Sequence, residues 1–86
     1  MTPAQVYAKA FSRGLNMAVR MIQQNRGITE SELFDMEYED RRDGTDIGCM
    51  LSSFARMPNG DDLCDAYEQG ISKGIKKGIW KMEDVR

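Results

Sequence analysis

The chain has 86 residues, of which 41% are apolar and 30% are charged, and its formal net charge is −2. This length fits one small domain with a thin core, and the apolar content excludes a disordered tail. No apolar run approaches the ~20 residues of a membrane span, and residues 1–5 carry no secretory signal, so we expect a cytoplasmic protein.

Histidine is absent from the chain, and only two cysteines occur, Cys49 and Cys64. Disulfide-stapled secreted scaffolds are much richer in cysteine, so we interpret both as buried free thiols, with a disulfide as the alternative. Without histidine the chain lacks the commonest general base and the commonest metal ligand. Phosphate-loop and nucleophile-elbow motifs are also missing. We therefore predict no catalytic site, no cofactor and no metal.

Residues 1–27 predict one long helix with a marked start and stop. Thr2 is the expected N-cap, Pro3 occupies the first helical position, and residues 25–27 (Asn-Arg-Gly) end the helix. Lys9, Arg13 and Arg20 share the back of this helix, which is predicted to be solvated, although a functional role for these bases stays open. The opposite, apolar face collects Tyr7, Phe11, Gly14, Leu15, Ala18 and Ile22.

The next segment gives two conflicting signals. Residues 29–32 form a T-x-x-E capping box, which predicts a helix start, whereas residues 34–39 alternate apolar and acidic side chains with the period of a strand. We favour the helix and leave the strand open for residues 33–40.

Two further helices are expected in the second half of the chain. Helical spacing of apolar residues predicts a short helix over residues 46–57, which Pro58 ends. Asn59 caps a last helix that runs to about Lys81. Asp61 and Asp62 lie in its first turn, where the dipole favours acids. Asp61, Asp65 and Glu68 share one helical face, and we attribute this cluster to the dipole in preference to a weak metal site.

Three glycines recur every four residues in this last helix, at Gly70, Gly74 and Gly78. Each costs a helix about 1 kcal/mol relative to alanine, so a close contact with another backbone should offset them. Residues 10–19 and 66–75 share one pattern of small and apolar residues, which favours packing of the first helix on the last. We also predict a homodimer, with self-association through Gly14, Ala18, Gly70, Gly74 and Gly78. The alternative is a helix broken near Gly74 and a short strand over residues 78–82.

These elements predict an all-α fold, a compact bundle of about four helices. One helical domain would span residues 1–82, and residues 83–86 would form a flexible tail.

Charge is segregated along the chain. Residues 1–27 hold four bases and no acid, residues 28–68 hold twelve acids against three arginines, and residues 69–86 hold five bases against two acids. The acidic middle can pair with the basic ends of its own fold or meet a basic partner. In the second case the predicted contact residues are Asp35, Glu37, Glu39, Asp40, Asp43 and Asp46.

Residues 23–33, which read QQNRGITESEL, resemble the first helix, the turn and the start of the second helix in repressor-type helix-turn-helix domains. The resemblance implies a small DNA-binding regulator. The chain departs from that family in the segment that would contact bases, where acidic side chains replace a polar reading helix and would repel phosphates.

The function that we expect is therefore a non-enzymatic interaction protein. A short, acidic-centred chain of this kind looks like the small regulators and inhibitors that phages and other mobile elements carry, which act by covering a surface of a larger protein. The expected partner has a basic surface, and nucleic-acid-binding proteins are a coherent class because exposed carboxylates can imitate phosphates. Direct DNA binding is the alternative function.

Overall fold

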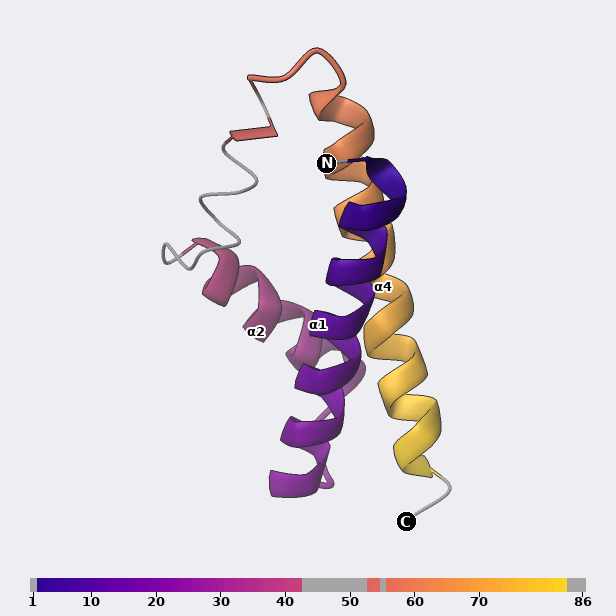
Figure 1. Ribbon diagram of the computed structural model, residues 1–86. Coiled ribbons are helices and arrows are strands. Elements are labelled where there is room, and N and C mark those ends of the chain that lie inside the picture. Colours follow the sequence, from indigo (N-terminus) through magenta and orange to yellow (C-terminus); the bar gives the residue numbers. More distant parts are fainter. Residues whose placement is uncertain (1, 43–52, 55, 84–86) are drawn as a thin grey trace.

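The computed structural model describes residues 2–42, 53–54 and 56–83. This part of the chain forms three α-helices, α1 (Pro3–Gln24), α2 (Glu30–Arg42) and α4 (Gly60–Glu83), and no strand (Figure 1). The all-α prediction is confirmed. The count of four helices is not, because most of the helix expected over residues 46–57 lies outside the described residues.

Helix α1 starts and stops where the sequence predicts. The Thr2 hydroxyl accepts a hydrogen bond from the Gln5 backbone N–H at 3.2 Å, and the Gln5 side chain accepts one from the Thr2 N–H at 2.9 Å. At the other end the Asn25 N–H donates to the Met21 carbonyl, and its side chain accepts from the Gly27 N–H. Both ends thus satisfy backbone groups that a helix leaves unpaired.

Helix α2 resolves the conflict between capping box and strand-like alternation. The Glu32 N–H donates to the Thr29 hydroxyl at 3.2 Å, and the Thr29 N–H donates to the Glu32 carboxylate at 3.2 Å. Helix follows from this cap through Arg42, so the strand alternative is wrong. The alternation misleads because a charged side chain, Glu37, lies on the buried side of the helix.

Helix α4 is continuous through all three of its glycines and ends at Glu83. The strand considered for residues 78–82 is therefore wrong. Asp61 and Asp62 occupy the first turn and Lys81 the last, as the dipole favours. The tail that we predicted from residue 83 onward falls, apart from Glu83 itself, outside the described residues.

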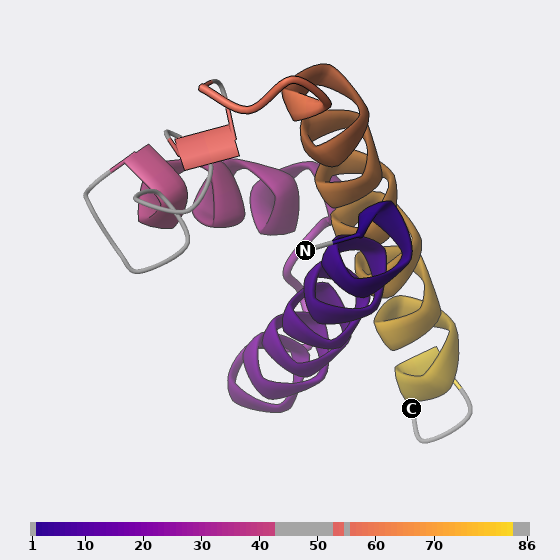
Figure 2. The same cartoon turned by 45° about the horizontal axis from the view of Figure 1, so that its top comes forward.

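Helices α1 and α4 run side by side in the same direction (Figures 1 and 2). Their backbones touch at the small residues. A Cβ built on Gly70 would lie 2.7 Å from the Ala10 Cβ, and one on Gly78 would lie 2.7 Å from the Ala18 Cβ. A Cβ on Gly74 would overlap the carbonyl oxygen of Phe11. The predicted contact of the first helix with the glycines of the last is confirmed within the chain.

This packing corrects our expectation of self-association. All five residues predicted for that role are buried, and the glycines contact the neighbouring helix of the same chain. A second copy therefore finds no exposed surface there. The residues concerned are Gly14, Ala18, Gly70, Gly74 and Gly78.

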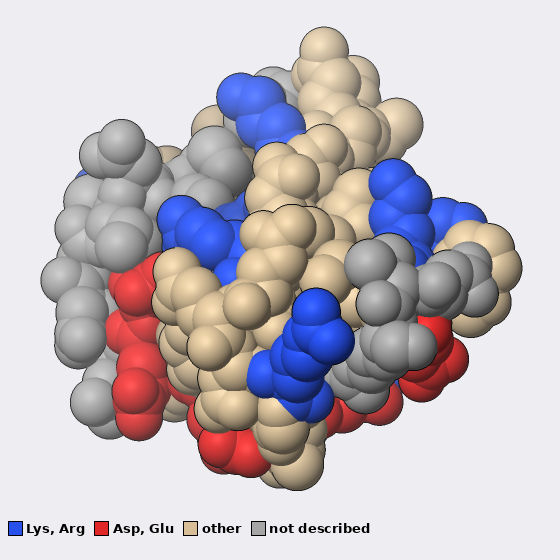
Figure 3. Space-filling model, turned by 90° about the horizontal axis from the view of Figure 1, so that it is seen from below, with Lys and Arg blue, Asp and Glu red and all other residues tan. Residues whose placement is uncertain are grey.

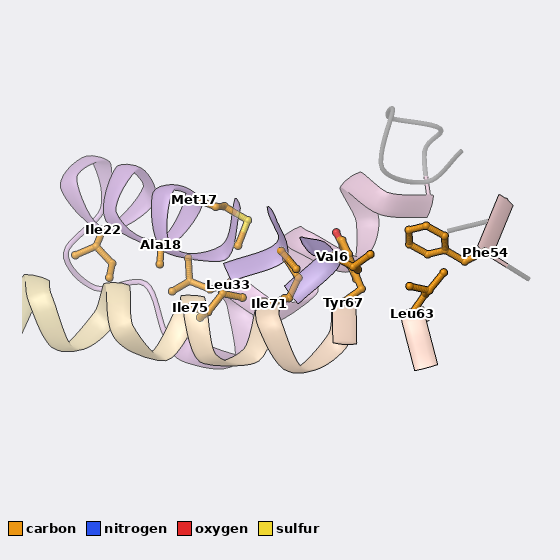
Figure 4. Close-up of a cluster of buried hydrophobic side chains, with 11 residues drawn as sticks. Val6, Met17, Ala18, Ile22, Leu33, Phe54, Leu63, Tyr67, Ile71 and Ile75 are labelled. Atoms are coloured by element: carbon orange, nitrogen blue, oxygen red, sulfur yellow. The ribbon is translucent and has the colours of Figure 1, made fainter. Parts of the chain in front are cut away.

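The apolar core lies between the helix pair and the segments that cover it (Figure 4). In α1 the buried face is turned from the predicted one. Gly14, Ala18 and Ile22 are buried as expected, whereas Tyr7, Phe11 and Leu15 are only half-buried because α4 approaches their backbone. The buried apolar side chains are Val6, Ala10, Met17, Ala18, Ile22, Leu33, Phe54, Leu63, Tyr67, Ile71 and Ile75. Among the described residues, no helix is long and apolar enough to cross a membrane.

Candidate functional site

Helix α2 lies across one face of the α1 and α4 pair (Figures 1 and 2). Its inner side holds two residues one turn apart, Leu33 and Glu37, which are 0% and 1% exposed. Leucine at this position joins the apolar core. A fully buried carboxylate is unusual and needs polar partners, because burial without them is costly.

Those partners come from the other two helices. The Tyr67 hydroxyl of α4 donates a hydrogen bond to the Glu37 carboxylate at 2.9 Å, and the Arg13 Nε of α1 lies 3.8 Å from the same oxygen. The Arg13 Nη2 lies 3.5 Å from the Asp40 carboxylate. We call Arg13, Glu37 and Tyr67 the Glu37 centre. It joins all three helices through polar groups and fixes which side of α2 faces inward.

The outer side of α2 is acidic. Glu32, Asp35 and Glu39 follow one another at spacings of three and four residues and are all exposed. We call these three residues the outer acidic stripe. Figure 3 shows Asp and Glu side chains along the lower margin of the molecule, with most Lys and Arg side chains above them.

The predicted docking residues divide between these two sides. Asp35 and Glu39 are exposed on the stripe, and Asp40 is exposed but lies beside Arg13. Placing Glu37 on an exposed surface was wrong, because Tyr67 and Arg13 hold it inside. Asp43 and Asp46 lie outside the described residues. The sequence reasoning missed Glu32, which the helical period of Asp35 and Glu39 could have revealed.

A groove of about 340 Å³ separates α2 from α4. Its base is formed by the buried Ile71 and Glu37, and its mouth by exposed carboxylates and by the ring of Tyr38, which is 57% exposed. Apolar walls with acids at the mouth suit a ligand that is both apolar and cationic. The described residues that line it are Phe34, Asp35, Glu37, Tyr38, Glu68 and Ile71.

A smaller hollow of about 180 Å³ lies between α1 and α2 and is lined by residues of both signs. Arg13 lines this hollow, and so do Arg20 and Asp40. The interpretation of Lys9, Arg13 and Arg20 as one solvated stripe is therefore wrong for Arg13. Lys9 and Arg20 are exposed.

Helix α4 is acidic at its start and basic at its end. Near its start Cys64 is a free, half-buried thiol, whose pKa is raised by burial and then by the carboxylates of Asp61, Glu68 and Asp65. Within the described ranges no group of three or more His, Cys, Asp or Glu residues is placed to hold a metal ion. Cys49 lies outside those ranges.

The last turns of α4 carry a basic and aromatic surface. Trp80 is 56% exposed, and the Lys77 ammonium lies 4.0 Å from the centroid of its ring, within cation–π range. Lys73, Lys76 and Lys81 are exposed on the same turns. Such a surface favours anionic partners.

Comparison of the chain with protein-family models, with curated proteins and with solved structures gives no match.

Proposed function

We propose that this chain is a non-enzymatic interaction protein that docks through the outer acidic stripe on a basic surface of a larger protein. The observation that carries the proposal is the arrangement of α2, whose inner side is fixed by Leu33 and Glu37 while its outer side presents Glu32, Asp35 and Glu39 at helical spacing. Regulators and inhibitors of this kind are common among phages and mobile elements. That class is our proposal for this chain.

Two physical points support a partner of opposite charge. Like charges at spacings of three and four residues weaken a helix by a few tenths of a kcal/mol per pair, so Asp35 and Glu39 do not serve the stability of α2, whereas Glu32 also caps its start. Ion pairs between described residues use Glu37 and Asp40, not the stripe. Exposed charge of one sign accelerates encounter with a complementary surface and sets its specificity.

The experiment compares two variants, each with its charge changed at three positions. Affinity purification from the native host identifies the partner, and the affinity of the purified partner is then measured for each variant. Glu32→Gln, which keeps an oxygen that can cap α2, combined with Asp35→Lys and Glu39→Lys should abolish binding, with the helical circular-dichroism spectrum unchanged, since exposed substitutions that spare a cap alter stability by about 0.5 kcal/mol or less. The matched control reverses Lys73, Lys76 and Lys77 to glutamate and should bind normally. Loss of binding in the control alone would overturn the proposal.

DNA binding is the second candidate function, and the surface around Trp80 is the observation that favours it. Exposed lysines beside an exposed aromatic ring suit a phosphate backbone and a stacking base. Trp80 is the only tryptophan of the chain, so its fluorescence reports directly on this surface. If this function holds, titration with mixed-sequence DNA should quench the Trp80 fluorescence, and this quenching should decrease steeply as the salt concentration rises. An unchanged spectrum excludes it.

The homodimer and the cytoplasmic location remain parts of the proposal. A dimer needs a surface other than the buried glycine contact, and a light-scattering mass tests it. The low cysteine content supports a reducing compartment.

A further inference from the structure

Exposed bases gather near the end of α4 at the spacing that places side chains on one side of a helix. We call them, with the tryptophan among them, the lysine face. The Lys77 ammonium lies 4.0 Å from the centroid of the Trp80 ring, so this surface joins positive charge to a large aromatic side chain. Its members are all exposed and are linked by separations of three and four residues: Lys73, Lys76, Lys77 and Trp80.

The outer acidic stripe of α2 matches the lysine face in length and is opposite to it in charge. The stripe runs from residue 32 to residue 39 and the face from residue 73 to residue 80, so each is about 10 Å long. Ion pairs between described residues join Arg13 to Glu37 and Asp40 and use neither surface. One chain thus carries both halves of a charge-complementary contact without pairing them with each other.

We propose that a second copy of this chain docks here, with the outer acidic stripe of each copy against the lysine face of the other. The inference rests on the homodimer in the proposed function and gives that dimer a surface other than the buried glycine contact. In a two-fold dimer the contact forms twice, because each copy offers the surface that the other receives.

Charge alone would make this contact weak, because an exposed ion pair contributes little in water. Trp80 supplies the apolar part. Its side chain is 56% exposed, and tryptophan is enriched among the residues that carry most of the binding energy at protein interfaces. Charged groups around a buried aromatic side chain form the polar rim that such interfaces have. We therefore expect a dimer that forms as the protein concentration rises and weakens as salt is added.

Sedimentation equilibrium of the full chain, under reducing conditions that prevent intermolecular disulfides, tests the contact without any partner. At low salt the mass should rise from one chain to two as the concentration increases. In roughly 1 M sodium chloride, where the screening length is about 3 Å, the mass should stay near that of one chain. Trp80 is the only tryptophan, so its emission should move to shorter wavelength over the same concentration range as the ring loses water.

Charge reversals locate the contact. Asp35→Lys combined with Glu39→Lys should abolish the dimer, and Glu32 is left unchanged because its carboxylate caps α2. Lys73→Glu combined with Lys77→Glu should abolish the dimer as well. The chain that carries all four reversals keeps the formal net charge of −2 and should dimerise again, because each surface then meets its opposite charge on the second copy.

The matched control is Lys9→Glu combined with Arg20→Glu. Both side chains are exposed on α1, and their reversal changes the net charge by as much as reversal of the two lysines of α4. This control should dimerise like the parent chain. Circular dichroism checks that each variant is folded. If the reversal on α2 does not fold, the milder pair Asp35→Asn and Glu39→Gln replaces it and should weaken the dimer in the same direction.

Failure of this surface and failure of the proposed function give different results. A chain that keeps the mass of one copy at every concentration overturns both this surface and the homodimer. A dimer that survives either pair of reversals, or that the four reversals together do not restore, overturns this surface and leaves the homodimer. Docking on a larger protein is measured separately, below the concentration at which the chain dimerises, because both contacts use the outer acidic stripe.

Discussion

The two helix contacts of this molecule are built on opposite principles. Helices α1 and α4 meet through glycine and alanine, so that the backbones themselves touch along several turns. Helix α2 is held through one buried leucine and a polar centre in which Tyr67 and Arg13 meet Glu37. The first contact depends on the absence of side chains and the second on particular side chains. The pair therefore forms a scaffold, and α2 is positioned on it with one defined side outward.

The largest effect is expected where a side chain is added to the scaffold. Gly74→Leu should destabilise the fold by about 3 kcal/mol or more, because even its Cβ would overlap the Phe11 carbonyl and neither backbone can move aside cheaply. The higher helix propensity of leucine recovers less than about 1 kcal/mol of this. Denaturant unfolding measures the change. The light-scattering mass should stay the same, since the contact lies within the chain.

The matched control for this substitution is Gly27→Ala, at the turn after α1. A Cβ there would lie 3.4 Å from the Asn25 side chain, an ordinary contact. The free energy of unfolding of the Gly27→Ala variant should therefore differ little from that of the parent chain. An increase in stability for Gly74→Leu, as helix propensity alone would give, contradicts the close contact.

The second prediction concerns the apolar part of the α2 contact. Leu33→Ala should cost about 2–3 kcal/mol, because the residue is fully buried and leaves a cavity between α2 and the pair. Hydrogen exchange should show the amides of α2 losing protection before those of α1 and α4. Ser31→Ala, exposed on the same helix, serves as the control. Equal loss of protection in all three helices would mean that α2 unfolds together with α1 and α4 and not before them.

The same contrast explains what the sequence could and could not reveal. Helix starts depend on neighbours in sequence, so Thr2, Thr29 and Asn59 were sufficient to place them. The glycine repeat also carried its own signal, because three costly residues at one spacing require a close contact. Whether that contact lay within the chain or between copies was not encoded locally, and the choice of self-association was wrong.

Which side of α2 faces the core could not be predicted from residues that are close in sequence. Asp35, Glu37 and Glu39 are alike in type and spacing, and nothing near them marks the middle one as buried. Its hydrogen-bond donor, Tyr67, lies thirty residues away in sequence. Only the helical period could have helped, since it sets Glu37 beside Leu33 and groups Glu32 with Glu39.

The third prediction isolates the polar part of the α2 contact. Tyr67→Phe removes the hydroxyl that donates to Glu37 and leaves a buried carboxylate with one donor fewer, so the fold should lose about 1–2 kcal/mol. A double-mutant cycle with Glu37→Gln measures the coupling between the two side chains. Tyr7→Phe, on a half-buried tyrosine of α1, is the matched control. A coupling energy near zero would show that the hydrogen bond between Tyr67 and Glu37 does not hold α2 in place.

The smallest effect is expected at the start of α4, outside the glycine contact, and concerns Cys64. Burial, followed by Asp61, Glu68 and Asp65, raises the pKa of this thiol, so its reactive thiolate is scarcer at a given pH than in an exposed cysteine. In a Cys49→Ser background, alkylation of Cys64 at pH 8 should be slower than that of a free cysteine peptide and should accelerate as pH rises. Asp61→Asn removes one of the charges that raise the pKa and should increase the rate by less than about tenfold, because burial is the larger cause.

Asp62→Asn is the matched control, since this neighbouring exposed acid does not contribute to the shift. Equal acceleration by both variants would mean that the rate follows the overall charge of the helix start and not the position of Asp61 beside the thiol.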